Sequence, residues 1–169
     1  MPIREGNIYR DGITAGVLGA TAVAAWFLIV DAMAGRPFFT PKLLGSGFMG
    51  VFDREGSLPV ESVTALIGIY TLFHYIAFCI AGIILAVIVQ VARTTPSILG
   101  GLFILFIVFQ VGSLGLVTLL ARATALGALA WYQVMAGNVV AAITMAAYFW
   151  RSHPELRGEL RHALDDGED

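Results

Sequence analysis

Long apolar stretches separated by short polar ones dominate the chain. They cover residues 13–35, 62–92, 98–121 and 125–150. Each reaches the roughly 20 apolar residues that cross a hydrocarbon core about 30 Å thick at 1.5 Å rise per residue. A soluble helical bundle would show a polar face at every turn, and these stretches lack one. The pattern predicts an all-α fold, an integral membrane four-helix bundle with four transmembrane helices in a single domain, residues 1–169.

The connections predict how these helices are arranged. Residues 93–95 and 122–124 are so few that the helices they join must be antiparallel neighbours. The first connection, residues 36–61, is longer and holds an apolar stretch, broken by glycines, that is too short to cross the bilayer. Thr40-Pro41 predicts the start of a short helix there. We expect this segment to be interfacial or re-entrant and to lie over the mouth of the bundle.

The polar ends predict orientation and a tail. Lys and Arg residues divide six to four in favour of the side that holds both termini. The positive-inside rule then places both termini in the cytoplasm, in a cell membrane such as a bacterial inner membrane. Residues 152–169 predict a short amphipathic helix, because Ser152 and Glu155 form a capping-box pattern ahead of leucines that recur every four residues. This helix would lie on the membrane surface or dock a cytoplasmic partner.

Composition narrows the function classes. The chain is 58% hydrophobic and 13% charged, against about 45–50% and 25% in soluble domains. The net charge of −2 comes without a basic stripe, which argues against nucleic acid as a partner. A single cysteine, Cys79, excludes a disulfide framework and a multi-cysteine metal site. Since the common hydrolase, phosphate-binding and redox motifs are also missing from the sequence, we expect a non-enzymatic protein.

Ionisable groups inside membrane spans are costly and are therefore the first functional candidates. Asp31, near the outer end of the first span, is either a proton or cation site or an interfacial carboxylate paired with Arg36 or Arg122. His74 follows Tyr70 by four residues, which puts both on one helical face. The imidazole could bond a neighbouring helix, carry a proton, or ligate a metal or haem. Haem held by two histidines would need a second histidine within the spans, and the sequence has none.

Three amides form a second group of candidates. Gln110 lies in the third span, and Gln133 and Asn138 lie in the fourth. Counted at about 1.5 Å per residue, they fall in the middle half of the bilayer together with His74. The sequence leaves two interpretations open: the amides hold helices together through hydrogen bonds, or they line a site for a solute or an ion.

Small residues at four-residue spacing predict faces where helices approach closely. These faces either pack within one bundle, form a homo-oligomer or seat a helix of a larger membrane complex. The helix-packing candidates are Gly12, Gly16, Ala20 and Ala24 in the first span, Gly82 and Ala86 in the second, and Gly137 and Ala141 in the fourth.

Three functional hypotheses follow from these patterns. The first is an accessory or scaffold subunit, or a homo-oligomer, that acts in the lipid bilayer through its small-residue faces. The alternative is a carrier of a small solute, a proton or a metal ion that uses Asp31, His74 and the Gln/Asn cluster. The second alternative is a haem- or quinone-binding membrane protein.

Overall fold

The described part of the chain is almost entirely helical and contains no strand. The computed structural model describes the backbone of residues 5–52, 62–92, 99–125 and 131–152, and the side chains of residues 8–50, 62–92, 101–116 and 131–152. In chain order the helices are α1 (Glu5–Met33), α2 (Phe39–Phe52), α3 (Val63–Ala92), α4 (Leu99–Ala125) and α5 (Trp131–Ser152). The predicted all-α class is therefore confirmed for this part of the chain.

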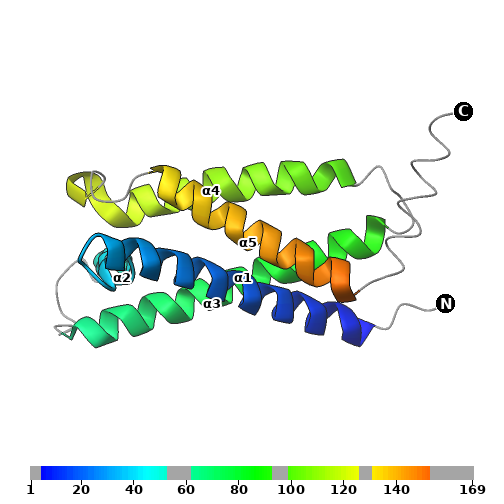
Figure 1. Cartoon of the computed structure of the whole chain (residues 1–169), viewed down its shortest axis with the longest axis horizontal. Helices are drawn as coiled ribbons and strands as arrows, with labels where there is room; N and C mark the ends of the chain where they lie inside the picture. Colours follow the sequence, from blue (N-terminus) through cyan, green and yellow to red (C-terminus); the bar gives the residue numbers. More distant parts are fainter. Residues whose placement is uncertain (1–4, 53–61, 93–98, 126–130, 153–169) are drawn as a thin grey trace, which may run out of the picture.

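The four long helices run side by side along the long axis, and α2 is seen nearly end-on where α1 ends and α3 begins (Figure 1). The axis of α2 therefore crosses that of the bundle. The start of α1 and the end of α5 lie together at the other end. An interfacial position of α2 stays a prediction.

Three helices are long and apolar enough to cross a membrane. They are the α1 segment Ile8–Met33, α3 and α5, and they indicate a membrane-associated protein. In α4 the described side chains form a shorter apolar segment, Gly101–Leu116. A fourth crossing by α4 therefore stays a prediction.

Three predicted boundaries differ from the structure. The first helix already begins at Glu5, ahead of the predicted residue 13. The connection expected at residues 122–124 is helical, because α4 continues to Ala125. No glycine or proline occurs between Leu116 and Leu126, so no residue there favours ending the helix. The last long helix begins at Trp131 and not at Ala125. The predicted connection at 93–95 and the predicted tail helix beyond Ser152 lie outside the described residues.

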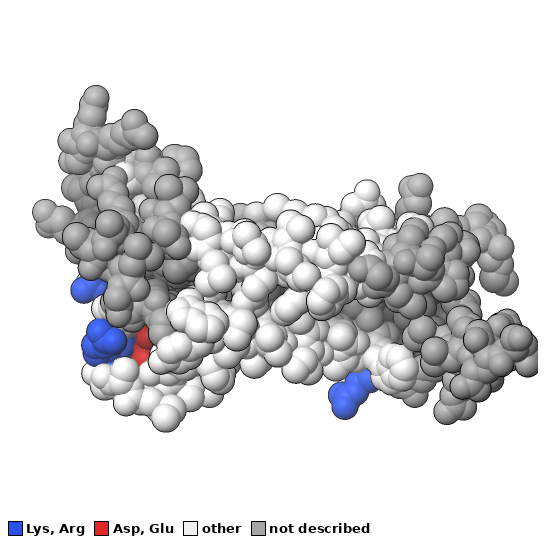
Figure 2. Space-filling view, turned by 90° about the horizontal axis from the view of Figure 1, so that it is seen from above, with Lys and Arg blue, Asp and Glu red and all other residues white. Residues whose placement is uncertain are grey.

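Charged residues lie towards the two ends of the bundle. In Figure 2, blue and red residues lie at the left end of the face, a blue group lies where the white surface borders the grey residues on the right, and the white surface between them is uncharged. In α1 the nearest charges on either side of the apolar segment are Asp11 and Asp31. Twenty positions separate them, which is about 30 Å of helix and close to the thickness of a hydrocarbon core. Exposed aromatic residues also mark the ends of α5, namely Trp131, Tyr132 and Trp150, as is common at membrane–water boundaries.

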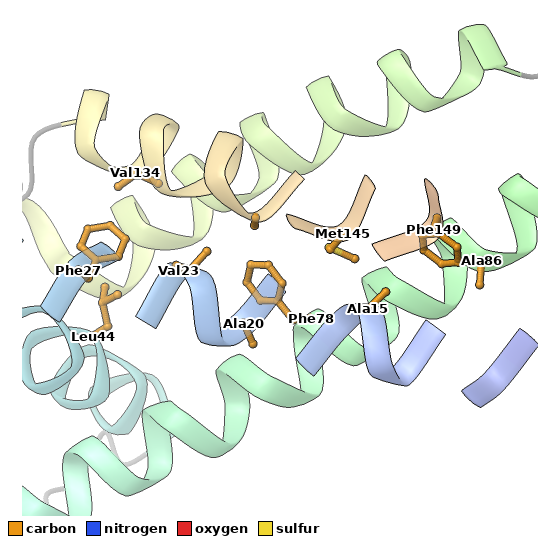
Figure 3. Close-up of a cluster of buried hydrophobic side chains, with 11 residues drawn as sticks. Ala15, Ala20, Val23, Phe27, Leu44, Phe78, Ala86, Val134, Met145 and Phe149 are labelled. Atoms are coloured by element: carbon orange, nitrogen blue, oxygen red, sulfur yellow. The ribbon is translucent and has the colours of Figure 1, made fainter. Parts of the chain in front are cut away.

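The core lies along α1, which packs mainly against α3 and α5. Side chains from these helices meet along the middle of the bundle, and Leu44 of α2 closes one end (Figure 3). By comparison, α4 packs mainly on α2 and touches α3 and α5 less. The buried apolar cluster contains Ala15, Ala20, Val23, Phe27, Leu44, Phe78, Ala86, Val134, Ala141, Met145 and Phe149.

A tight corner joins α1 to α2. Gly35 adopts a left-handed conformation with φ of 70°, and its N–H donates to the Ala32 carbonyl at 2.9 Å, while the Arg36 N–H donates to the Asp31 carbonyl at 2.8 Å. This is the Schellman arrangement that commonly ends helices at glycine. Phe38 is also left-handed, with φ of 64°, and its carbonyl accepts the first helical hydrogen bond of α2, from Lys42.

Candidate functional site

The Asp31 carboxylate links α1 to the first turn of α2. Its Oδ2 accepts the Thr40 backbone N–H at 2.7 Å, and its Oδ1 accepts the Thr40 hydroxyl at 2.8 Å. Asp31 is 5% exposed and Thr40 is 2% exposed. An N-terminal N–H of a helix needs an acceptor, and here α1 supplies it. Thr40, expected from the sequence to precede the short helix, lies in its first turn.

Asp31 was expected to pair with Arg36 or Arg122, or to hold a cation or proton. The guanidinium of Arg36 instead lies over the Phe39 ring, 4.1 Å from its centre. The side chain of Arg122 is outside the described residues. Both carboxylate oxygens therefore serve the contact between α1 and α2.

His74 joins α3 to α1 in the middle of the bundle. Its Nε2 donates to the Ala20 carbonyl at 3.1 Å. Since a carbonyl only accepts, Nε2 must carry a hydrogen. The imidazole is buried and lies against the rings of Tyr70, 5.6 Å away between centres, and Phe78, 4.7 Å away. Tyr70 and His74 thus share a face, in ring contact.

The amides Gln110 and Asn138 meet between α4 and α5. The Asn138 Nδ2 donates to Gln110 Oε1 at 2.8 Å and to Ser113 Oγ at 2.6 Å. The Ser113 hydroxyl donates to the Gln110 backbone carbonyl at 2.9 Å, so its oxygen is available to accept. These two hydrogen bonds fix the orientation of the Asn138 amide, with its nitrogen towards both acceptors. The Nε2 of Gln110 is buried and has no hydrogen-bond partner in the described structure.

Gln133 takes part in a different contact. Its backbone carbonyl, not its amide side chain, accepts the Trp26 indole N–H at 3.0 Å, which joins α5 to α1. The hydrogen bonds of the Asn138 amide nitrogen go to Gln110 and Ser113, so a place for the Gln133 side chain in the amide cluster stays a prediction.

Most of the small-residue candidates lie where helices meet inside the chain. A Cβ placed on Gly12 would lie 2.5 Å from the Ile83 Cα, and one on Gly16 would lie 2.6 Å from the Cys79 Cα. From the other side, a Cβ on Gly82 would meet the backbone of Gly12 and Gly16. The backbones of α1 and α3 therefore touch, as small residues allow.

The remaining small residues divide between buried and exposed positions. Ala20, Ala86 and Ala141 belong to the buried cluster. Gly137 faces the Trp26 and Phe27 rings of α1, with its Cβ position 3.1 Å and 3.3 Å from them. Ala24, in contrast, is exposed. In the described structure α1, α3 and α5 use the small-residue faces for contacts with one another.

The exposed face of α4 was not singled out by the sequence analysis. Ile104, Val108, Val111, Gly112 and Gly115 are all exposed, and their spacing puts them on one side of the helix. A Cβ on Gly112 or Gly115 would have no atom within 4 Å. The sequence shows this face only as two glycines three residues apart. Without the contacts between helices, these glycines cannot be distinguished from the small residues that are buried between α1, α3 and α5.

Sequence reasoning also missed the partners of the polar candidates. Thr40 and Ser113 complete the contacts of Asp31 and Asn138, and Thr21 shares a hydrogen bond of 2.9 Å with Tyr75 between α1 and α3. Single Ser and Thr residues in apolar stretches carry no signal of their partner. Only their positions across helices identify them.

The candidates form separate contacts. Along α1, Asp31 is eleven positions beyond Ala20, the partner of His74, which is about 16 Å of helix. No group of three or more His, Cys, Asp or Glu side chains that could hold a metal ion occurs in the described ranges. Comparisons with known protein families, with curated proteins and with solved structures gave no match.

Proposed function

We propose that the protein is a four-span, non-enzymatic membrane scaffold that self-associates through α4. The observation that carries this proposal is the contrast between its glycines. Gly12, Gly16 and Gly82 are in backbone contact within the chain, whereas Gly112 and Gly115 are open on an exposed apolar helix face.

Membrane helices associate where small residues let their backbones approach, because lipid already satisfies their apolar side chains. An exposed face with glycines at its centre therefore favours another helix over lipid alone. Gly112 and Gly115 leave a shallow notch in this face, because neither has a side chain. Val108 and Val111, beside the glycines, supply stiff side chains that can pack around the notch. A second copy of α4 presents the same notch, so a two-fold symmetric pairing is self-complementary.

The polar contacts favour association over transport. The carrier hypothesis needs Asp31, His74 and the amides to act on one solute. Asp31 gives both oxygens to Thr40, His74 donates to Ala20, and Asn138 donates twice to α4. Each group thus holds two helices together, a common role for polar side chains in membranes.

Mass measurement in mild detergent tests the proposal. We expect the unmodified chain to be a dimer or larger, and Gly112→Leu/Gly115→Leu to be a monomer, since leucines would fill the notch. Gly68→Leu is the matched control, because Gly68 is also exposed and its Cβ would meet no atom within 4 Å, but it lies on α3.

The control should keep the mass of the unmodified chain. A monomeric unmodified chain, or a double variant as large as the control, would show that α4 does not mediate association. A complex that contains other polypeptides and loses them in the double variant would replace self-association by a heterologous assembly.

A further inference from the structure

The corner between α1 and α2 combines exposed apolar and exposed cationic side chains. Met33 is 84% exposed and Phe38 is 51% exposed. Arg36 and Lys42 are exposed beside them. Blue and red residues lie side by side at one end of the face in Figure 2. We call Met33, Arg36, Phe38 and Lys42 the corner residues.

This corner has a defined conformation. Gly35 and Phe38 both adopt left-handed backbone angles, and the Asp31 carboxylate holds Thr40 on the far side of the turn. Such backbone angles persist in a non-glycine residue only where surrounding contacts hold them. The corner residues therefore project from a fixed turn and not from a freely moving loop.

The cations of the corner are not neutralised by its own carboxylate. Asp31 is buried and directs both oxygens to Thr40. The Arg36 guanidinium is placed over the Phe39 ring, a contact that orients its plane and keeps its charge. Lys42 lies one turn further, on the exposed side of α2.

The position of the corner along α1 matches the surface of a bilayer. It begins at Asp31, about 30 Å along α1 from Asp11, which is one hydrocarbon thickness. Apolar side chains at this level enter the boundary of the acyl chains, while Arg and Lys reach the headgroups. Guanidinium and ammonium groups both bind phosphate oxygens, and Arg does so with two parallel hydrogen bonds.

We infer that the corner residues bind the phosphate of an anionic phospholipid, with Arg36 and Lys42 on the headgroup and Met33 and Phe38 against the acyl chains. The inference rests on the proposed membrane placement of the chain, but not on its self-association. It assigns to α2 the role of fixing the corner at the bilayer surface. The acyl contacts distinguish this site from one for free phosphate.

The test uses the full chain reconstituted in vesicles of phosphatidylcholine and phosphatidylglycerol in equal amounts. The measured quantity is the ratio of the two lipids that stay bound after mild detergent extraction, determined by native mass spectrometry. We expect enrichment of phosphatidylglycerol, reduced in Arg36→Gln/Lys42→Gln by about fivefold for each cation removed. Arg10→Gln/Arg151→Gln is the matched control, because both residues are exposed cations at the opposite end.

A second variant tests the apolar part of the site. Phe38→Asn removes the ring while asparagine still tolerates a left-handed backbone, so the turn is expected to persist. Retention of phosphatidylglycerol should fall although the net charge is unchanged. Circular dichroism and the elution volume of each variant verify that it is folded.

Several results would overturn the inference. Equal losses in the two glutamine double variants would mean general attraction between cations and the bilayer. Full displacement of the lipid by an equal concentration of inorganic phosphate or of an acidic peptide would mean an anion site without lipid specificity. A chain that inserts and dimerises but shows no preference for phosphatidylglycerol refutes this inference alone, whereas failure to insert into either lipid refutes the membrane placement itself.

Discussion

Replacing Gly16 by alanine tests a close backbone contact between α1 and α3. The added Cβ would lie 2.6 Å from the Cys79 Cα and near the Phe78 carbonyl. Ordinary contact begins at 3.4 Å, so α1 and α3 must separate locally by at least about 0.8 Å. The obstacle is backbone, so no side chain can turn away to make room.

The separation has a second consequence one turn along α1. The His74–Ala20 hydrogen bond is 3.1 Å long, and the same displacement would lengthen it to about 3.9 Å, beyond hydrogen-bonding range. Overpacking of a close contact costs about 1–3 kcal/mol, and an inter-helix hydrogen bond in a membrane contributes about 0.6 kcal/mol on average. We expect Gly16→Ala to lower the free energy of unfolding by about 2 kcal/mol.

The assay is unfolding by titration with sodium dodecyl sulfate in mild detergent, followed by circular dichroism. Gly68→Ala is the control, since the new methyl group there would meet no atom within 4 Å. That variant should be unchanged or more stable, by up to about 1 kcal/mol, because alanine favours helix over glycine. The two substitutions therefore have opposite expected signs. A Gly16→Ala variant as stable as Gly68→Ala would refute the backbone contact between α1 and α3.

Substitutions at three further positions probe the polar contacts. Asp31→Ala should lower the free energy of unfolding by about 2 kcal/mol, and Asp31→Asn should lower it by less because one acceptor remains for Thr40. Chemical unfolding of the two variants measures this difference. An alanine variant as stable as the unmodified chain would contradict the contact between Asp31 and Thr40. His74→Phe keeps the ring contacts and loses the donor to Ala20, so we expect the stability to fall by about 0.6–1.7 kcal/mol. In a variant that already carries Gly16→Ala this hydrogen bond is already broken, so thermal unfolding should show no further loss of stability from His74→Phe. Asn138→Leu leaves two acceptors on α4 without their donor. If this destabilises the contact between α4 and α5 by about 1.4 kcal/mol, proteolysis after α4 should become roughly tenfold faster. An unchanged cleavage rate would argue against the contact.

The lengths of the apolar stretches were sufficient to predict the helices. A helix needs about 20 apolar residues to cross a bilayer, and this requirement is visible in composition alone. The same reasoning excluded the segment before Phe52 from crossing and placed a short helix there, as α2 now shows. The end of α4 was missed because Arg122 and Thr124 resemble a polar connection, while their neighbours favour helix.

The candidate site was less predictable, because partners depend on how helices are placed. Asp31 and His74 stood out as costly groups in apolar stretches. Their partners did not, since Thr40 is one of many threonines and the Ala20 carbonyl is a backbone group that every residue has.

The small-residue stripe of α1 separates the two kinds of information most clearly. Its four-residue spacing in the sequence determined that one side of this helix could approach another closely. Only the tertiary structure decided that α3 fills that side and that the stripe ends at Ala20, with Ala24 exposed. The reason is geometric: at 3.6 residues per turn, positions four apart rotate by about 40° per step. From Gly12 to Ala24 the rotation reaches about 120°, which carries Ala24 out of the contact with a neighbouring helix.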